Sequence, residues 1–140
     1  MKAGASISGA VMFLLLGVRP AAAPAPIGGP GRIVTVRITI HHSAFSPRHL
    51  RVADGSLVAF HVTNTDPIDH ELIVGDQATQ DRVERGDEPD HHARGQVSVA
   101  AGASASTYYV FGGQRWWQFG CHLPGHWAYG MRGTIEVARR

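Results

Sequence analysis

The sequence predicts an all-β sandwich of seven to eight strands. Residues 33–40 alternate apolar and polar side chains and are rich in β-branched residues, which is typical of a strand with one buried face. Further apolar segments of strand length follow, separated by turn-forming pairs such as Asp54-Gly55 and Gly112-Gly113. No segment shows the apolar period of an amphipathic helix. We expect strands at residues 33–40, 48–53, 56–64, 69–74, 95–100, 104–111, 115–121 and 131–138.

The first 25 residues are predicted to be a secretory signal peptide. Lys2 precedes an apolar stretch over residues 7–18, and small alanines follow it. The stretch is short and contains Ser8 and two glycines, which disfavours a permanent membrane anchor. Residues 26–31 are rich in proline and glycine and are expected to form a linker, with one folded domain over residues 32–140. We therefore expect an exported protein, periplasmic or extracellular.

Composition narrows the class of protein. The chain has 140 residues and 44% hydrophobic content, enough for one domain with a sizeable core. Its formal charge is only +2 and its arginines are scattered, which disfavours nucleic-acid binding. A single cysteine excludes an internal disulfide, a four-cysteine zinc or iron–sulfur site, and a copper centre bridged by two thiolates.

That cysteine opens a short segment with the chemistry of a copper site. Cys121 is followed by His126 and Met131, which together offer a thiolate, an imidazole and a thioether. Such ligands suit a copper ion that changes oxidation state, once a second imidazole completes the site. His70 is the main candidate, because it follows a proline-containing turn and opens a predicted strand. The alternative is an inert buried cysteine beside ordinary histidines. The competing histidines are His41, His42, His49, His61, His91, His92 and His122.

The spacings Asn64-x5-His70 and Cys121-x4-His126-x4-Met131 resemble those of the cupredoxin family, over about residues 32–138. The resemblance implies a Greek-key β-sandwich that holds one type 1 copper. His70, Cys121 and His126 would lie in the copper plane, with Met131 as a weak axial ligand. It also implies the transfer of single electrons between exported redox partners such as a cytochrome or an oxidase. We expect a monomer. A copper carrier or buffer is the alternative function.

An enzyme is not expected, although the run from Cys121 to His126 also resembles multicopper oxidases. Those enzymes need a trinuclear copper cluster fed by several His-x-His pairs, and this chain has none. The residue before Cys121 is Gly120, where the oxidases have a histidine. A second copper site formed by His122 and other histidines at a trimer interface, as in copper nitrite reductases, is a remote alternative.

The surroundings of the loop can also be predicted. Trp117, Phe119 and Cys121 share one face of their strand, so the two aromatic rings should pack in the core beneath the metal, while His122 should point away from it. Glu71 follows the first histidine, where the family often has Asn or Ser. By resemblance, redox partners would dock on an apolar patch around His126. That patch would consist of Leu123, Pro124 and Trp127.

Residues 75–94 are polar and carry six acidic side chains and the pair His91-His92. We expect a solvated, flexible insertion, because adjacent histidines alone do not define a coordination geometry. The alternative is a second, weaker metal site.

Overall fold

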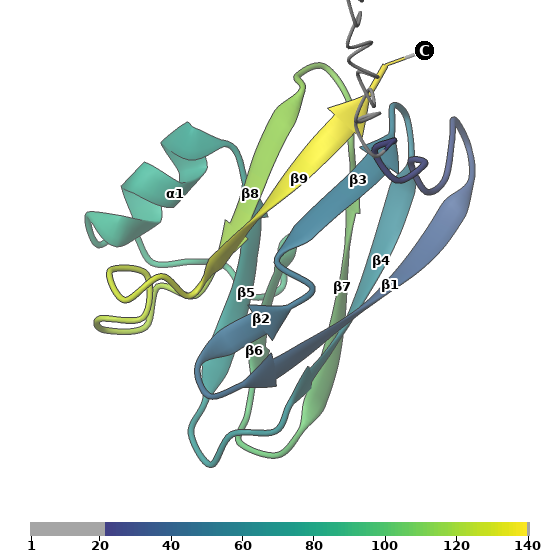
Figure 1. Cartoon of the computed structure of the whole chain (residues 1–140). Coiled ribbons are helices and arrows are strands. Elements are labelled where there is room, and N and C mark those ends of the chain that lie inside the picture. Colours follow the sequence, from purple (N-terminus) through teal and green to yellow (C-terminus); the bar gives the residue numbers. More distant parts are fainter. Residues whose placement is uncertain (1–21, 140) are drawn as a thin grey trace, which may run out of the picture.

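We describe a computed structural model, which covers residues 22–139 in detail. The predicted signal peptide falls mostly on residues 1–21, which lie outside the described part. Two sheets pack face to face, and Figure 1 shows them as the two layers of a sandwich. One sheet has the order β2-β1-β4-β7 and the other β3-β9-β8-β5-β6. The strands are β1 (Ile33–His41), β2 (Ala44–Ser46), β3 (His49–Ala53), β4 (Leu57–Asn64), β5 (His70–Gly75), β6 (Gln96–Val99), β7 (Ser104–Val110), β8 (Trp116–Gly120) and β9 (Arg132–Ala138).

The predicted sandwich is confirmed, and each expected strand is present with its ends shifted by at most one residue. The additional strand, β2, has only three residues, too few to show an alternating pattern. Two strand pairs are parallel, β1 with β4 and β3 with β9. The other pairs are antiparallel.

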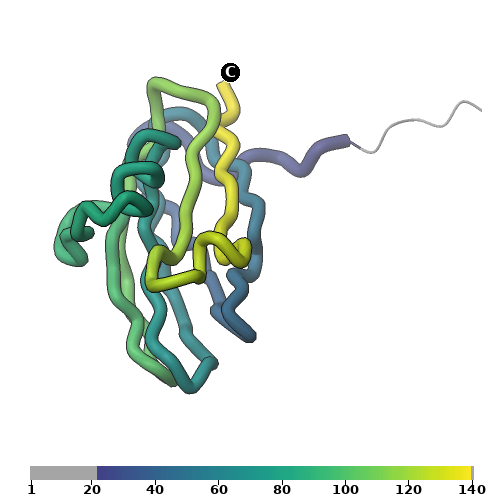
Figure 2. The backbone as a smooth tube through the Cα atoms, turned by 90° about the vertical axis from the view of Figure 1, so that its left-hand side faces the viewer, coloured from purple at the N-terminus to yellow at the C-terminus, as the bar shows by residue number. Residues whose placement is uncertain are grey.

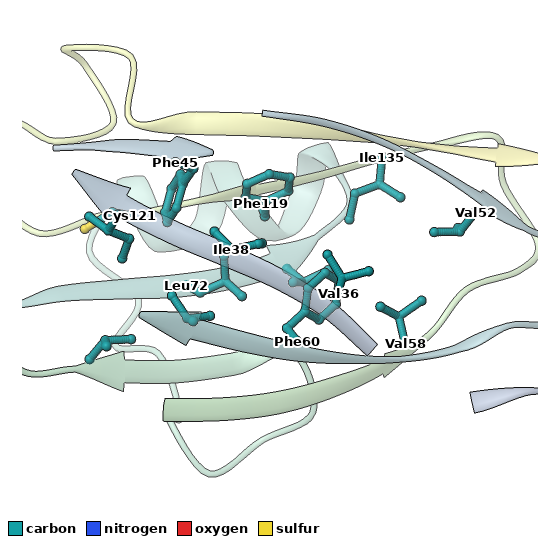
Figure 3. Packing of buried hydrophobic residues seen from close by; sticks show 14 of the residues in the cluster. Val36, Ile38, Phe45, Val52, Val58, Phe60, Leu72, Phe119, Cys121 and Ile135 are labelled. Atoms are coloured by element: carbon teal, nitrogen blue, oxygen red, sulfur yellow. The ribbon is translucent and has the colours of Figure 1, made fainter. Parts of the chain in front are cut away.

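The hydrophobic core lies between the sheets and reaches as far as the single cysteine. Figure 3 shows Cys121 at one end of the buried cluster, with Val52 and Val58 at the other. Phe119 is fully buried and meets Phe45 edge-on, with ring centroids 5.3 Å apart. Trp117 is half-buried against the same cluster, so the predicted shared face of β8 is confirmed.

The polar insertion after β5 contains a helix that the sequence pattern did not predict. Residues 77–84 form helix α1 (Gln77–Glu84), which begins at Asp76, whose carboxylate accepts the Thr79 N–H at 2.8 Å. The fully buried residue of the helix is Gln80, a polar side chain. The helix therefore lacks the apolar period that would have predicted it. Within residues 22–139 no helix has the length and apolar character needed to cross a bilayer.

Two segments that lie far apart in the sequence meet on one side of the sandwich. Helix α1 and the loop between β8 and β9 both lie on the left of Figure 1 and face the viewer in Figure 2.

At the N-terminal end, Ile27 pairs in parallel with Val52, and its N–H donates to the Arg51 carbonyl at 3.0 Å. Part of the predicted linker thus lies against the edge strand β3.

Candidate metal centre

The loop that connects β8 and β9 folds back on itself through main-chain hydrogen bonds. The Cys121 N–H donates to the Met131 carbonyl at 3.1 Å, and the Met131 N–H donates to the His126 carbonyl at 2.9 Å. A further turn is closed by the His126 N–H, which donates to the Leu123 carbonyl at 2.9 Å. These bonds place the first, middle and last candidate ligands of the loop next to one another.

Three of the four predicted ligands converge at this loop. His70, Cys121 and His126 each present one ligand atom, and these atoms lie within 4.8 Å of one another. Cys121 Sγ lies 3.1 Å from His126 Nδ1, and the two imidazole ring centroids are 4.9 Å apart. In the described part of the chain this is the one group of three histidine, cysteine or acidic side chains arranged closely enough to hold an ion. The seven competing histidines are not part of it.

Only one of the two ring nitrogens of His70 is free to bind a metal. Its side chain is fully buried, and Nδ1 has no hydrogen-bond partner. Nε2 lies 2.9 Å from the Asp66 carboxylate. A buried polar atom without a partner is costly, so the Nδ1 lone pair needs an occupant that the protein itself does not supply. A metal ion at this position fits that requirement.

Cys121 is fully buried at one end of the core. Burial raises the pKa of its thiol to about 11, and the Glu71 carboxylate acts in the same direction. The backbone N–H groups of Glu71 and Leu123 donate to the sulfur and oppose the rise in pKa. A soft cation would displace the proton, and these two donors would then stabilise the thiolate.

His126 is only half-buried. Its pKa is lowered, first by partial burial and second by the nearby His70. The imidazole is therefore neutral over a wider pH range than a free histidine, which leaves Nδ1 available as a ligand.

Met131 is 2% exposed, and its side chain belongs to the hydrophobic cluster that contains Cys121. Main-chain bonds of the loop hold Met131 next to Cys121 and His126. A buried thioether at this position also helps to exclude water from the site.

The buried Glu71 connects three segments around the site. Its Oε1 accepts the His122 N–H at 2.8 Å, and its Oε2 lies 2.7 Å from His91 Nε2. The carboxylate therefore binds the β8–β9 loop (residues 121–131), which we call the metal loop, on one side. On the other side it binds the segment after α1. His91 is occupied by this contact, and the described residues bring no third ligand to the pair His91-His92.

As expected, His122 points away from the metal, toward α1. Its side chain is 2% exposed, with Nδ1 2.8 Å from Glu84 Oε2 and Nε2 2.7 Å from Gln80 Oε1. The ring stacks on Trp127, with centroids 4.6 Å apart and planes inclined by 17°. Trp127 in turn covers Gly120, where an added Cβ would lie 2.4 Å from the indole ring. The helix thus holds the metal loop through His122.

Sequence reasoning assigned no role to two residues that position this site, Asp66 and Gln80. Both are buried polar side chains whose partners lie in other segments. Asp66 lies four residues before His70, within a turn rich in polar residues, where one more carboxylate gives no signal. Gln80 could be suspected only from the capping residue Asp76 ahead of it.

A family model described as "Copper binding proteins, plastocyanin/azurin family" matches residues 33–138. This span contains the whole sandwich and all four predicted ligands. The chain belongs to the plastocyanin/azurin family of copper-binding proteins. Its resident metal is accordingly copper, and the buried His70, Cys121 and His126 group is the place in this family member that could hold one ion.

Two relatives of this chain are named copper-resistant cuproprotein CopI. The one from Rubrivivax gelatinosus is 34% identical over 124 residues, covering 82% of this chain and 75% of the relative. The one from Vibrio cholerae serotype O1 is 26% identical over 130 residues, covering 90% of this chain and 77% of the relative.

Solved structures support the fold of this plastocyanin/azurin family member. Reduced auracyanin from Roseiflexus castenholzii matches with a TM-score of 0.63 and 20% identity, covering 74% of this chain and 96% of auracyanin. Auracyanin A from Chloroflexus aurantiacus matches with a TM-score of 0.62 and 16% identity, covering 76% and 100%. The multicopper oxidase mgLAC matches with a TM-score of 0.60 and 16% identity, covering 78% of this chain and 40% of the oxidase. At these identities the likeness concerns the fold alone.

Proposed function

We propose that this chain is an exported copper-resistance protein that holds one copper ion in a type 1 site and passes single electrons through it. His70 Nδ1, Cys121 Sγ and His126 Nδ1 would hold the ion, together with the thioether of Met131. The observation that carries the proposal is the convergence of these imidazole and thiol ligand atoms within 4.8 Å, with the buried His70 Nδ1 unpaired.

Bound copper would supply a one-electron change between Cu(II) and Cu(I). The protein supplies a site that is already assembled. Asp66 holds His70, main-chain bonds hold Cys121 and His126 together, and the core below Cys121 excludes water. A rigid site of mixed soft and borderline ligands suits both oxidation states, so little has to move when an electron arrives.

The role in resistance is supported by the name of the CopI relatives, one of which is 34% identical to this chain. Export is supported by the apolar N-terminal stretch and the small residues after it. No catalytic residue is proposed, because the histidines outside the metal site are not gathered into a second group in the described residues.

Electrons would enter and leave at His126, the half-exposed ligand. Leu123 and Trp127 flank it and are half-buried, Pro124 is exposed, and Tyr129 is 93% exposed. This apolar and aromatic surface fits a redox protein partner that approaches the loop.

A copper carrier or buffer is a second candidate function. The exposure around His126 favours it, because Pro124 and Gly125 beside this ligand are exposed. The exposed surface beside His126 that would serve electron transfer would also allow the copper ion to leave.

The test begins with the visible absorption and EPR spectra of the protein loaded with one equivalent of Cu(II). We expect an intense thiolate-to-copper band that Cys121→Ser and His70→Gln abolish and that His61→Gln retains. His61 is a matched control, since it lies on β4 and its Nδ1 contacts Ser106 at 3.1 Å, outside the copper ligands. A spectrum that survives Cys121→Ser would overturn the type 1 assignment.

Two rates then distinguish an electron-transfer protein from a copper carrier. Stopped-flow oxidation and reduction measures electron exchange, and competition with a Cu(I) chelator measures release of copper. Fast electron exchange with slow release would support the proposed function. Slow electron exchange with fast release to the chelator would support the carrier instead.

A further inference from the structure

The strongest unexplained feature near the copper site is the buried carboxylate of Asp66. It lies in the turn between β4 and β5 and is 5% exposed. Its Oδ2 lies 2.9 Å from His70 Nε2, on the side of the ring away from the unpaired Nδ1. The interior therefore holds a full negative charge directly behind one of the proposed ligands.

The turn between β1 and β2 holds this carboxylate in place. The backbone N–H of His42 donates to Oδ1 and that of Ser43 donates to Oδ2, both at 2.7 Å. Both residues have positive φ, 49° and 53°, which residues with side chains adopt at a cost. Successive N–H groups in a turn form a concave site for an anion, and here the anion is the Asp66 side chain.

The carboxylate determines which nitrogen of His70 carries the proton. An ionised carboxylate can only accept, so Nε2 must donate and Nδ1 must keep its lone pair. The ring also cannot rotate away without breaking the contact between Nε2 and the buried carboxylate. The ligand atom therefore points into the site before any metal arrives.

The charge has a second consequence that a neutral acceptor would not have. A backbone carbonyl behind Nε2 would select the same tautomer but would add no net charge. A carboxylate makes the imidazole a stronger electron donor, and its field favours the more positive metal ion. Both effects stabilise Cu(II) relative to Cu(I).

We propose that Asp66 is a positioning residue of the copper site that holds His70 as the Nε2–H tautomer and lowers the reduction potential of the bound copper. This inference rests on the proposed copper site. Its two parts are measured separately, one on the metal-free protein and one on the copper-loaded protein.

The first measurement uses the unaltered, metal-free protein and records the ¹⁵N chemical shifts of the His70 ring. We expect a protonated Nε2 and an unprotonated Nδ1. A protonated Nδ1, or rapid exchange between the two tautomers, would overturn the positioning role. This result does not depend on whether the protein binds copper, so it remains informative if the proposed function fails.

The second measurement compares the reduction potential of the protein with that of Asp66→Asn. At a fixed applied potential, we expect the ratio of Cu(II) to Cu(I) to fall about tenfold, a rise in potential of about 59 mV for one electron. Asp69→Asn is the matched control, because this exposed carboxylate of the same turn contacts the Ala101 N–H instead of His70. It should change the ratio by less than about twofold, since solvent screens exposed charges.

An Asp66→Asn protein that binds copper with an unchanged potential would refute the electrostatic part. If Asp66→Asn does not fold, Asp66→Glu keeps the charge and tests the geometry, and the His70 tautomer in the unaltered protein still decides the positioning role. Where Asp66→Asn does fold, Asp66→Glu should retain a lower potential than Asp66→Asn. Equal potentials in the two would contradict the proposal.

Discussion

The two imidazoles of the copper site are held by different kinds of structure. His70 is fully buried, and a network of polar side chains from the turn before it holds its ring. His126 is half-buried in a loop that is closed by main-chain hydrogen bonds, with exposed Pro124 and Gly125 beside it. One half of the site is therefore anchored by the interior and the other half by a surface loop.

The difference separates two requirements of a copper site. A ligand anchored by buried polar groups keeps its orientation when the metal is absent, because any movement leaves those groups unpaired. A ligand on a partly exposed loop provides a route for electrons or for the metal itself. The site is rigid where it meets the core and accessible where it meets solvent.

The largest effect should come from removing each imidazole in turn. We expect both His70→Gly and His126→Gly to lose the thiolate-to-copper band of the Cu(II) protein. Added imidazole should restore the band only in His126→Gly, because solvent reaches that position and does not reach His70. The measurement is visible absorption during titration with imidazole, with the unaltered protein as control. Equal recovery in both variants would show that the two sides are equally accessible.

Asn64→Ala should destabilise the turn that carries Asp66 and His70. The buried Asn64 amide donates to the carbonyls of Ile68, Val99 and Ala100, and its oxygen accepts the Asp66 N–H. Loss of these bonds leaves buried groups unpaired and should lower the free energy of unfolding by about 3 kcal/mol. Denaturant unfolding of the copper-free protein measures the change.

The neighbouring Thr63→Ala is the control for Asn64→Ala. Thr63 is half-buried and makes one hydroxyl contact, with Ser104 at 3.0 Å. Its loss should be about 1 kcal/mol or less. Equal losses in the two variants would mean that the Asn64 network contributes little beyond a surface hydrogen bond.

Gln80→Ala should weaken the support that α1 gives to the metal loop, with a smaller loss of unfolding free energy than Asn64→Ala. The Gln80 amide donates to the Ile73 carbonyl at 3.1 Å, and its oxygen lies 2.7 Å from His122, the residue next to Cys121. We expect a loss of about 2 kcal/mol, with faster amide exchange in α1 and in the metal loop. The exposed Gln77→Ala in the same helix is the control. A Gln80 variant whose loop exchanges no faster than in the Gln77 variant would rule out the helix as a support of the loop.

The smallest expected effect concerns the start of α1 and depends on pH. The pKa of Asp76 is lowered, mainly by hydrogen bonds from the Thr79 side chain and backbone. Since the folded pKa lies below the unfolded one, the ionised cap stabilises the fold above the unfolded pKa. That contribution is lost as the pH falls through the folded pKa.

The variants Asp76→Asn and Asp76→Ala separate the charge from the cap. At pH 7 we expect Asp76→Ala to lose about 1 kcal/mol of unfolding free energy and Asp76→Asn to lose less, since Asn also caps helices. Both differences should narrow in acid, when Asp76 itself is protonated. A gap that widens in acid would contradict the sign of the pKa shift.

Strand positions were predictable from the sequence because the burial signal repeats every second residue. Val58, Phe60 and Val62 on β4 alternate with less buried residues, and this order is visible without a structure. Helix α1 was not predictable in the same way. The helix is stabilised by a capping aspartate and a buried glutamine. Because its buried side chain is polar, the helix shows no apolar period in the sequence.

The sequence by itself determined the β-sandwich and the ligand chemistry, because both depend on residue type and short spacing. The thiol, imidazole and thioether of Cys121, His126 and Met131 lie within eleven residues. His70 was a candidate by resemblance, but the tertiary structure alone decided that its Nδ1 is left unpaired beside them and that Asp66 lies behind its other nitrogen. These features depend on contacts between segments distant in the chain, such as the β1–β2 turn that holds Asp66, and no local pattern encodes such contacts.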